Sequence, residues 1–313
     1  MRAATIADEQ LSVQDHADPE PGNYEILVRV RAAGLNGADM MQRRGLYPAP
    51  PGSPPDIPGL ELAGEVVGLG AGVTRFAEGD RVMAIVGGGG QAELAIVHER
   101  QAMPVPEAFD WVHAGGFAEV FTTAHDALFT QAGLRMGDRL LVHGGAGGVG
   151  TAAIQLGRGA GAHVTATVRD EAKRPAVEEL GASAIDPEGF ADAGPFDVIL
   201  ELVGAPNLGP DVKAMATGAR MVVIGIAAGA KGELNLGALM GKRARIMAST
   251  LRARPLEEKA ATARAVERHV LPLVDAGRVR VPIADTFPLD RVADAYDRFA
   301  DGGKLGKIVL EMG

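Results

Sequence analysis

Three glycines spaced as in a nucleotide-binding turn are the strongest chemical signal in this chain. Gly145, Gly147 and Gly150 lie within residues 143–150, HGGAGGVG. In such a turn one glycine permits the tight bend, one lets a pyrophosphate approach the backbone, and one allows close packing of helix and strand. The N–H groups that begin the helix then face the anion. The pattern predicts cofactor contacts from Gly145, Gly147, Gly148, Val149 and Gly150.

The flanking segments favour dinucleotide binding over a bare structural turn. A buried strand is expected at residues 140–142, LLV, and a helix at residues 151–156, TAAIQL. A second strand at residues 163–168, HVTATV, completes a βαβ unit of suitable length. Because a chain with 43 glycines contains such spacing by chance, the flanking elements carry the prediction.

The residues after the second strand select between NAD and NADP. A carboxylate at the strand tip accepts hydrogen bonds from the ribose 2′-OH and repels a 2′-phosphate. Here the strand is expected to end at Val168, with Arg169 next and Lys173 shortly after. Their positive charges favour a 2′-phosphate, so we expect NADPH. Asp170 and Glu171 leave NAD open if the strand ends later, and the two basic residues also suit the solvated start of a helix.

The composition excludes several classes of function. A chain of 313 residues should divide into two domains. The net charge of −9 and an aromatic content of 4% disfavour a nucleic-acid partner. Neither a membrane span nor a signal peptide is evident, so we expect a cytoplasmic protein with no membrane partner. The absence of cysteine excludes disulfides, thiolate catalysis and zinc bound through cysteine.

The pattern of expected elements changes twice along the chain. Residues 1–118 hold short β-type runs among glycines and prolines, which indicates a β-rich domain. Residues 119–256 alternate strands and helices, as in a doubly wound parallel sheet, and residues 257–313 should return to the first domain. Further strands are expected at 24–31, 61–67, 80–86, 93–97, 198–203, 220–225 and 306–310, and helices at 172–180, 257–276 and 289–300.

Several strings spread over the whole chain form one family pattern. They are residues 33–39 AGLNGAD, 41–48 MQRRGLYP, 58–65 PGLELAGE, 87–92 GGGGQA, 147–156 GGVGTAAIQL and 306–310 GKIVL. In this order they resemble the medium-chain dehydrogenase/reductase superfamily, and most closely its zinc-free quinone oxidoreductase (zeta-crystallin-like) branch. The resemblance implies an α/β protein with a GroES-like catalytic domain, a Rossmann NADPH-binding domain and reduction of electron-poor acceptors.

The same comparison implies that no metal is bound. Zinc-dependent members carry a cysteine where this chain has Asn36 and a histidine where it has Leu60. Without a Lewis acid the pKa of an alcohol stays high, so alcohol oxidation is disfavoured. Glu61 is interpreted as a structural carboxylate, and His143 as a residue that fills the strand end before the glycine turn.

The resemblance also implies roles for single side chains. Asn36 should lie beside the nicotinamide ribose, although it would also suit a turn cap. Tyr47 should lie at the mouth of the acceptor pocket, either as a hydrogen-bond donor or as a wall. Thr123 should begin a helix that faces the nicotinamide, with an ordinary N-cap as the alternative. The cofactor channel should be lined by Leu202, Val203, Gly204, Gly225, Ile226 and Leu251, and the pocket size should depend on loops 43–56, 87–92 and 251–254.

Three functions remain open on the sequence alone. The first is an NADPH-dependent quinone reductase acting in the interdomain cleft, which needs no dedicated acid and can yield one- or two-electron products. The second is an enone, alkenal or enoyl-thioester reductase, in which Tyr47 or Asn36 stabilises an oxyanion or supplies a proton. The third is a non-catalytic NADPH-binding structural protein. The family also implies a homodimer, with residues 228–236 as the expected sheet edge.

Overall fold

The computed structural model describes residues 1–313 and contains two compact units. The first unit comprises residues 1–122 and 251–313, and the second comprises residues 123–250. The first boundary between the units lies between residues 122 and 123, a few residues beyond the predicted domain end at 118. It falls within α3 (Ala118–His125), which is one continuous helix. No helix of the protein is both long enough and apolar enough to cross a membrane.

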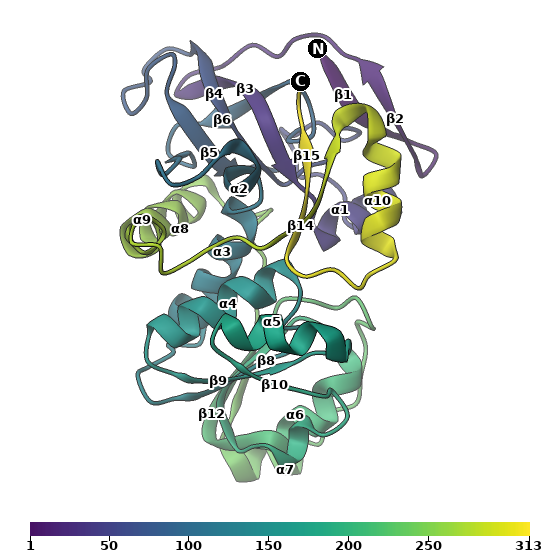
Figure 1. Ribbon diagram of the computed structural model, residues 1–313, viewed down its shortest axis with the longest axis vertical. Helices are drawn as coiled ribbons and strands as arrows, with labels where there is room; N and C mark the ends of the chain where they lie inside the picture. Colours follow the sequence, from purple (N-terminus) through teal and green to yellow (C-terminus); the bar gives the residue numbers. More distant parts are fainter. The chain divides into compact units, whose positions relative to one another are not determined.

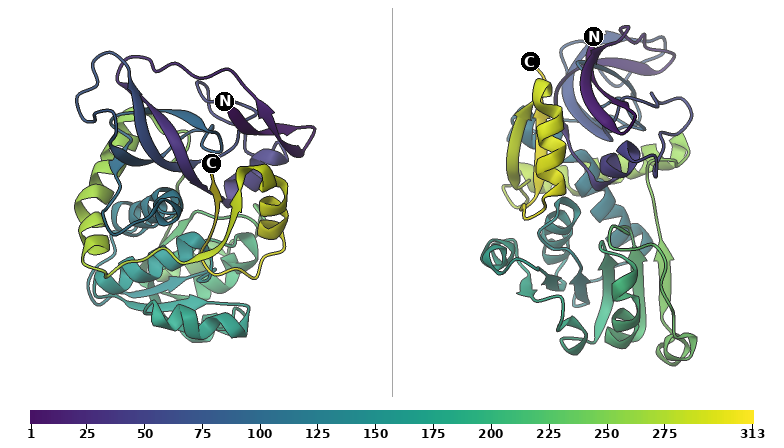
Figure 2. Two further views of the ribbon diagram at one scale, coloured as in Figure 1. Left: turned by 45° about the horizontal axis from the view of Figure 1, so that its top comes forward. Right: turned by 90° about the vertical axis from the view of Figure 1, so that its right-hand side faces the viewer.

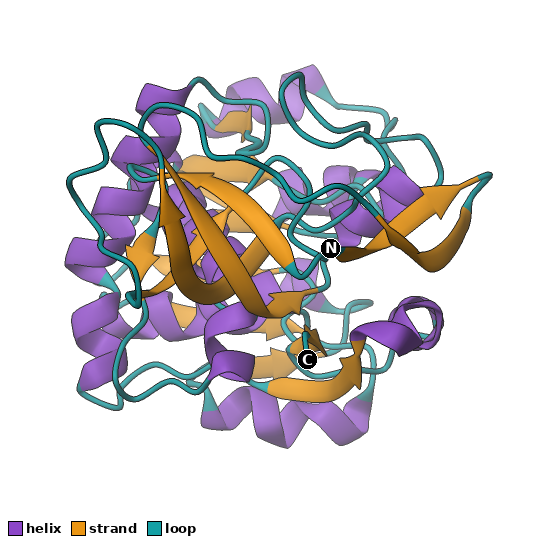
Figure 3. Ribbon diagram, turned by 90° about the horizontal axis from the view of Figure 1, so that it is seen from above, coloured by secondary structure: helices purple, strands orange, loops and turns teal.

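The first unit is built on a seven-stranded, mainly antiparallel sheet. Its strand order is β14-β15-β3-β4-β5-β7, with β6 paired to β3, and Figure 3 shows how strongly its strands curve. The strands of this unit are β1 (Arg2–Ala7), β2 (Gln10–Asp15), β3 (Glu25–Gly34), β4 (Glu61–Leu69), β5 (Arg81–Ile85), β6 (Leu94–His98), β7 (Met103–Pro104), β14 (Ile283–Pro288) and β15 (Lys307–Glu311). Its other helices are α1 (Gly37–Arg43), α2 (Trp111–Gly115), α8 (Leu256–His269), α9 (Leu271–Asp275) and α10 (Val292–Ala300).

The C-terminal segment completes the sheet begun by the N-terminal segment. β15 pairs antiparallel with β3 and parallel with β14, and α10 lies along these strands (Figure 2). The alternation of β3 places Ile26, Val28 and Val30 in the core, as expected for a strand with one buried face. Tyr296 of α10 joins the same core.

The second unit is a doubly wound parallel sheet of six strands in the order β10-β9-β8-β11-β12-β13. Figure 1 shows α4 and α5 on one side of this sheet and α6 and α7 on the other. The strands are β8 (Arg139–Val142), β9 (His163–Thr167), β10 (Ser183–Ile185), β11 (Phe196–Glu201), β12 (Met215–Val223) and β13 (Arg245–Ala248). The helices are α4 (Gly148–Gly159), α5 (Arg174–Glu179), α6 (Leu208–Ala214) and α7 (Leu236–Lys242). The strand order reverses between β8 and β11, which is where ligands bind such sheets.

The structure confirms the fold class and corrects some local predictions. β9 ends at Thr167 rather than Val168. The helix expected at 257–276 is divided into α8 and α9, because Pro272 stands in the first turn of α9 and cannot continue a helix from before. The edge strand beside β12 is β13 and not residues 228–236, of which 228–235 form a loop and Leu236 begins α7.

Candidate functional site

The glycine turn of the second unit combines tight packing with one open position. Gly144, with φ of 67°, makes the left-handed bend. A Cβ on Gly145 would lie 2.7 Å from Ala166 Cβ, and a Cβ on Gly150 would lie 2.3 Å from Gly144 O. A Cβ on Gly147 would meet only Gly144 O, at 3.4 Å. Gly145 and Gly150 are therefore required for packing, whereas Gly147 keeps the space in front of the helix clear.

The helix that follows presents its N-terminus to this space. α4 has 12 residues, begins at Gly148 with Gly147 as its N-cap, and has no acidic residue in its first turn. Its first N–H groups have no carbonyl partner within the helix, and the helix dipole adds positive potential there. The predicted contacts at Gly148, Val149 and Gly150 lie in this turn. The donors and the open space fit the diphosphate of a dinucleotide.

A buried glutamate organises the neighbouring strand end. Glu201 Oε1 accepts the N–H groups of Val203 at 2.5 Å and Gly204 at 2.7 Å. These two predicted cofactor residues therefore have no N–H group to offer a ligand. Gly225 packs its backbone against the same segment, since a Cβ there would lie 2.2 Å from Leu202 O, and Ile226 follows it with 41% exposure.

A hydrogen-bond chain beneath the turn begins at His143, a buried histidine that does more than fill the strand end. His143 Nε2 lies 2.8 Å from Asp211 Oδ1, and His143 Nδ1 lies 3.2 Å from Thr167 Oγ1. The same Oγ1 accepts the Gly144 N–H at 3.2 Å. Burial raises the pKa of Asp211 to about 6, and Glu201 adds to this effect. The chain ties the bend at Gly144 to α6 of the opposite layer.

The two basic side chains that follow β9 have no acidic partner. Arg169 is exposed and Lys173 is partly buried, and neither forms an ion pair. Asp170 instead caps the short helix that follows, since its Oδ1 accepts the Ala172 N–H at 3.1 Å. One oxygen of the Asp170 carboxylate is thus used in capping.

Thr123 and Leu251 are two further predicted cofactor positions. Thr123 is buried in the last turn of α3, which begins at Ala118, so it neither begins that helix nor caps it. Leu251 is partly buried and is the first residue of the returning segment in the first unit.

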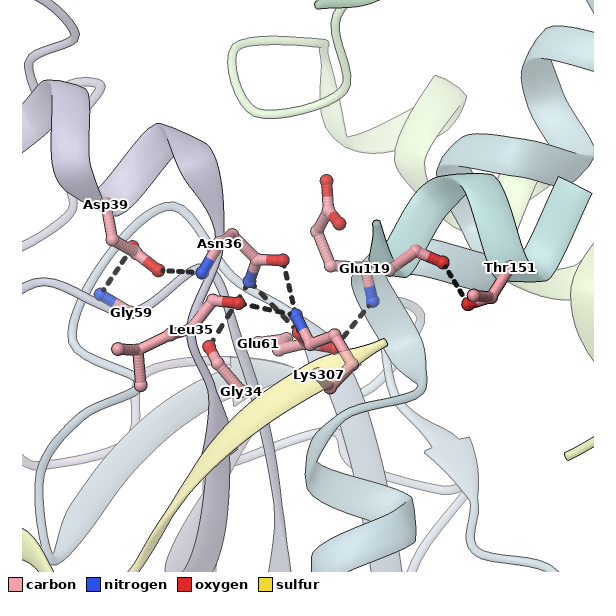
Figure 4. A network of polar contacts seen from close by, with 10 residues as sticks. Gly34, Leu35, Asn36, Asp39, Gly59, Glu61, Glu119, Thr151 and Lys307 are labelled. Atoms are coloured by element: carbon pink, nitrogen blue, oxygen red, sulfur yellow. Dashed lines mark hydrogen bonds and ion pairs between the residues drawn. The ribbon is translucent and has the colours of Figure 1, made fainter. Parts of the chain in front are cut away.

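In the first unit a buried lysine occupies the centre of a polar network (Figure 4). Lys307 is 3% exposed and uses its three N–H groups on three acceptors. Its Nζ lies 2.6 Å from Asn36 Oδ1, 2.7 Å from Leu35 O and 2.6 Å from Glu61 Oε1. Lys307 stands in the string GKIVL, where a lysine in a strand carries no sequence signal of burial.

The network orients the Asn36 side chain. Its Nδ2 donates to Glu61 Oε1 at 3.0 Å and to Gly34 O at 3.2 Å, while Oδ1 faces the Lys307 ammonium. This assignment of oxygen and nitrogen satisfies every partner. Both amide N–H groups are committed, and Oδ1 keeps one lone pair to accept a further hydrogen bond. The second carboxylate oxygen of Glu61 accepts the Glu119 N–H at 2.8 Å, so the structural interpretation of Glu61 agrees with its contacts.

Asp39 fixes the helix that follows Asn36. Its carboxylate accepts the Asn36 N–H at 2.9 Å and the Gly59 N–H at 3.2 Å. Burial raises the pKa of Asp39 from 3.8 to about 7, against the lowering effect of its donors and Lys307. Because the pKa of Asp39 is higher in the folded protein than in the unfolded chain, binding a proton at Asp39 stabilises the fold. This contribution to the free energy of unfolding is fully present below pH 3.8 and is lost as the pH rises through about 7.

Tyr47, the other predicted catalytic residue, lies in the loop after α1. Its side chain is partly buried, and the guanidinium of Arg252 lies over its ring, 5.1 Å from the ring centroid. Asn36 and Tyr47 thus flank α1 on either side in the chain.

The open position at Gly147 yields a test of dinucleotide binding. We expect Gly147→Ala to fold normally but to weaken NADPH binding about tenfold, and Gly147→Val to abolish it, because each side chain fills the phosphate space. Calorimetric titration and thermal melting measure the two effects. Gly150→Ala is the contrasting variant, since its Cβ would collide with Gly144 O and should lower stability. Unchanged NADPH affinity in Gly147→Val would show that the diphosphate binds elsewhere.

The buried ion pair yields a test of stability. Lys307→Met leaves the Glu61 charge buried without its cation, which should cost about 3–5 kcal/mol in unfolding free energy. Lys307→Met combined with Glu61→Gln should recover much of that loss, because no uncompensated charge remains. Urea unfolding measures both, with Lys213→Met as control. Lys213 pairs with Asp192 at 2.9 Å, but the two side chains are 68% and 82% exposed, so its loss should change the free energy of unfolding little. If the double variant loses as much unfolding free energy as Lys307→Met and Glu61→Gln lose separately when added together, the two charges do not compensate each other.

Comparisons with known proteins agree with this geometry. Residues 22–107 match a family model described as an alcohol dehydrogenase GroES-like domain, and residues 180–310 match one described as a zinc-binding dehydrogenase. Quinone oxidoreductase of Rattus norvegicus is 32% identical, with 99% of this chain and 97% of the relative covered. The Homo sapiens protein of that name is 30% identical over 95% and 92% of the two chains.

A solved structure of an alcohol dehydrogenase superfamily protein from Novosphingobium aromaticivorans aligns over the full length of both chains, with a TM-score of 0.89 and 29% identity. The family predicted from the sequence is confirmed, and the relatives' shared chemistry is that of a nicotinamide-dependent oxidoreductase. The chain belongs to the quinone oxidoreductase family of the medium-chain dehydrogenase/reductase superfamily.

Proposed function

We propose that this NAD(P)-dependent oxidoreductase uses NADPH to reduce small quinones without a metal ion. The observation that carries the proposal is the Lys307 network. Its ammonium lies 2.6 Å from both Asn36 Oδ1 and Glu61 Oε1. A second cation bound to Asn36 Oδ1 would lie close to this ammonium and would be repelled by its charge. Leu60, at the other matched ligand position, is buried, and its side chain offers no lone pair.

Each part of the cofactor has a matching group in the chain. The N–H groups at Gly148, Val149 and Gly150 would hold the diphosphate, with Gly147 leaving room for it. Arg169 and Lys173 would hold the 2′-phosphate. The other proposed channel residues are Thr123, Val203, Gly204, Gly225, Ile226 and Leu251. When bound, the nicotinamide supplies a hydride to the acceptor.

Asn36 and Tyr47 are the side chains proposed to serve the reaction. Asn36 can only accept a hydrogen bond at its remaining lone pair, so it suits a ribose hydroxyl and cannot stabilise an oxyanion. Tyr47 is therefore the side chain proposed to donate a hydrogen bond to an oxygen of the acceptor. A reduced quinone is a modest base and takes its proton from solvent, whereas an enone requires a proton at carbon. The relatives named quinone oxidoreductase favour the quinone.

We also propose a homodimer formed through the edge of the parallel sheet. β13 is the last strand of that sheet and has one unpaired edge. The adjacent α7 exposes Leu236 at 63% and Met240 at 75%. An unpaired strand edge beside exposed apolar side chains suits a second copy of the chain.

The cofactor preference is tested by removing the two free cations. NADPH should bind at least about tenfold better than NADH in the wild type. The double substitution Arg169→Ala, Lys173→Ala should raise the Michaelis constant for NADPH and leave the use of NADH nearly unchanged. Lys213→Ala, which removes an exposed lysine of the same unit, is the control. A wild type that prefers NADH would place the ribose on Asp170 or Glu171 and reject the assignment.

The acceptor is tested by Tyr47→Phe with a quinone and an enone in parallel assays of NADPH oxidation. For a quinone the loss in kcat/KM should be roughly tenfold or less, because its protonation is undemanding. For an enone it should be about a hundredfold or more if the phenol carries the oxyanion or the proton. Severe loss with quinones would reject reduction without a protein acid. Tight NADPH binding without turnover of any acceptor would favour the non-catalytic structural protein.

A further inference from the structure

Arg252 is a buried cation in the first unit that has only neutral hydrogen-bond partners. Its side chain is 3% exposed and forms no ion pair. Nε donates to Gly87 O at 2.7 Å, Nη1 to Tyr47 O at 2.8 Å, and Nη2 to Gln42 Oε1 at 2.5 Å. Burying a guanidinium without a carboxylate is costly, and simple packing would be served better by an apolar side chain.

The three partners belong to two regions of the sequence, both far from Arg252. Gln42 lies in α1, Tyr47 lies in the following loop, and Gly87 lies in the loop after β5. Gln42 also donates through Nε2 to Pro55 O at 3.2 Å. Arg252 therefore holds loop 43–56 at both ends, directly at Tyr47 and through Gln42 at Pro55.

The two loops also pack closely on each other. A Cβ on Gly87 would lie 2.1 Å from Ser53 Oγ and 3.0 Å from Pro50 Cγ. Movement of either loop therefore displaces the other. These are two of the loops that the sequence predicts will set the size of the acceptor pocket, and Arg252 belongs to the third.

The charge of Arg252 acts on Tyr47 as well. The guanidinium carbon lies 5.1 Å from the centroid of the Tyr47 ring, within the range of a cation–π contact. Burial lowers the pKa of Arg252, whereas the charges of Asp39 and Tyr47 raise it. Lys259 of α8 is the other cation that interacts with Arg252. The ring of Tyr47 is thus fixed by a backbone hydrogen bond and by the charge on one of its faces.

We propose that Arg252 is a positioning residue for the electron-acceptor pocket, acting through Tyr47 and the two loops that it joins. This inference rests on the proposed function. The acceptor class is an electron-poor carbonyl compound with a flat ring, which needs a fixed wall rather than a charged partner. Because Arg252 does not contact the phosphate-binding turn, its effect should fall on the acceptor and not on NADPH.

Arg81 offers a matched control within the same unit. Its guanidinium carbon lies 4.5 Å from the centroid of the Trp111 ring, and Nη2 donates to Phe109 O at 2.7 Å. It makes the same two kinds of contact as Arg252 but touches neither loop. A purely structural loss of an arginine over an aromatic ring should therefore look alike in Arg81→Met and Arg252→Met.

The test combines steady-state kinetics with a double-mutant cycle. Arg252→Met should raise the KM for a quinone about tenfold or more, while kcat and the KM for NADPH stay within about twofold. Arg252→Lys keeps the charge but loses the planar fork, so it should recover only part of the loss. In a Tyr47→Ala background, Arg252→Met should raise the quinone KM by a smaller factor than in the wild type, because the ring is gone while the hydrogen bonds to the two loops remain. Arg81→Met should leave the quinone KM unchanged.

Hydrogen exchange gives a readout that needs no activity. Arg252→Met, or Arg252→Lys if the first variant does not fold, should speed amide exchange in residues 43–56 and 87–92, and Arg81→Met should not. Equal effects on the KM values for NADPH and quinone, or full multiplication of the two effects in the double variant, would overturn the role of Arg252. If the wild type reduces no acceptor, the proposed function and this role both fail. If it reduces quinones but Arg252→Met does not change their KM, this inference alone fails.

Discussion

The first unit depends on satisfying one buried ammonium. Lys307 needs three acceptors, and they come from separate segments: Leu35 O and Asn36 Oδ1 from the turn after β3, and Glu61 Oε1 from β4. β15 brings Lys307 to them, so the C-terminal segment has to pair with β3. A buried charge tolerates little displacement of its partners. The same network determines which atoms of Asn36 remain available to a ligand.

In the second unit the main constraint is the shape of the glycine turn, which has to leave space in front of α4. Gly144 bends, Gly145 and Gly150 pack tightly, and Gly147 leaves space. The bend is held from below by Thr167, His143 and Asp211, and the next strand end by Glu201, whose carboxylate takes two backbone N–H groups. Polar groups thus position the backbone, and the α4 N-terminus stays available for an anion.

Local patterns predict what depends on local sequence. The fold class, the glycine turn and most strands follow from period and spacing, as β4 at Glu61–Leu69 illustrates. Contacts between distant segments are not predictable in this way, because Lys307, Asp211 and Arg252 meet partners brought by the tertiary fold. Thr123 lies later in its helix than predicted, because α3 begins at Ala118. The family resemblance places residues 228–236 at the sheet edge, and the sequence pattern misses β13, because a strand of only four residues shows too little alternation to be predicted.

A structure of the protein crystallised with NADPH tests most directly whether the glycine turn holds the diphosphate and whether the Lys307 network keeps Asn36 free of metal. We expect the diphosphate at the first turn of α4 beside Gly147, the 2′-phosphate within hydrogen-bond distance of Arg169 or Lys173, and Asn36 still held by Lys307 and Glu61. A diphosphate bound away from this turn would contradict this expectation. So would an Asn36 side chain released from Lys307 and bound to a metal ion.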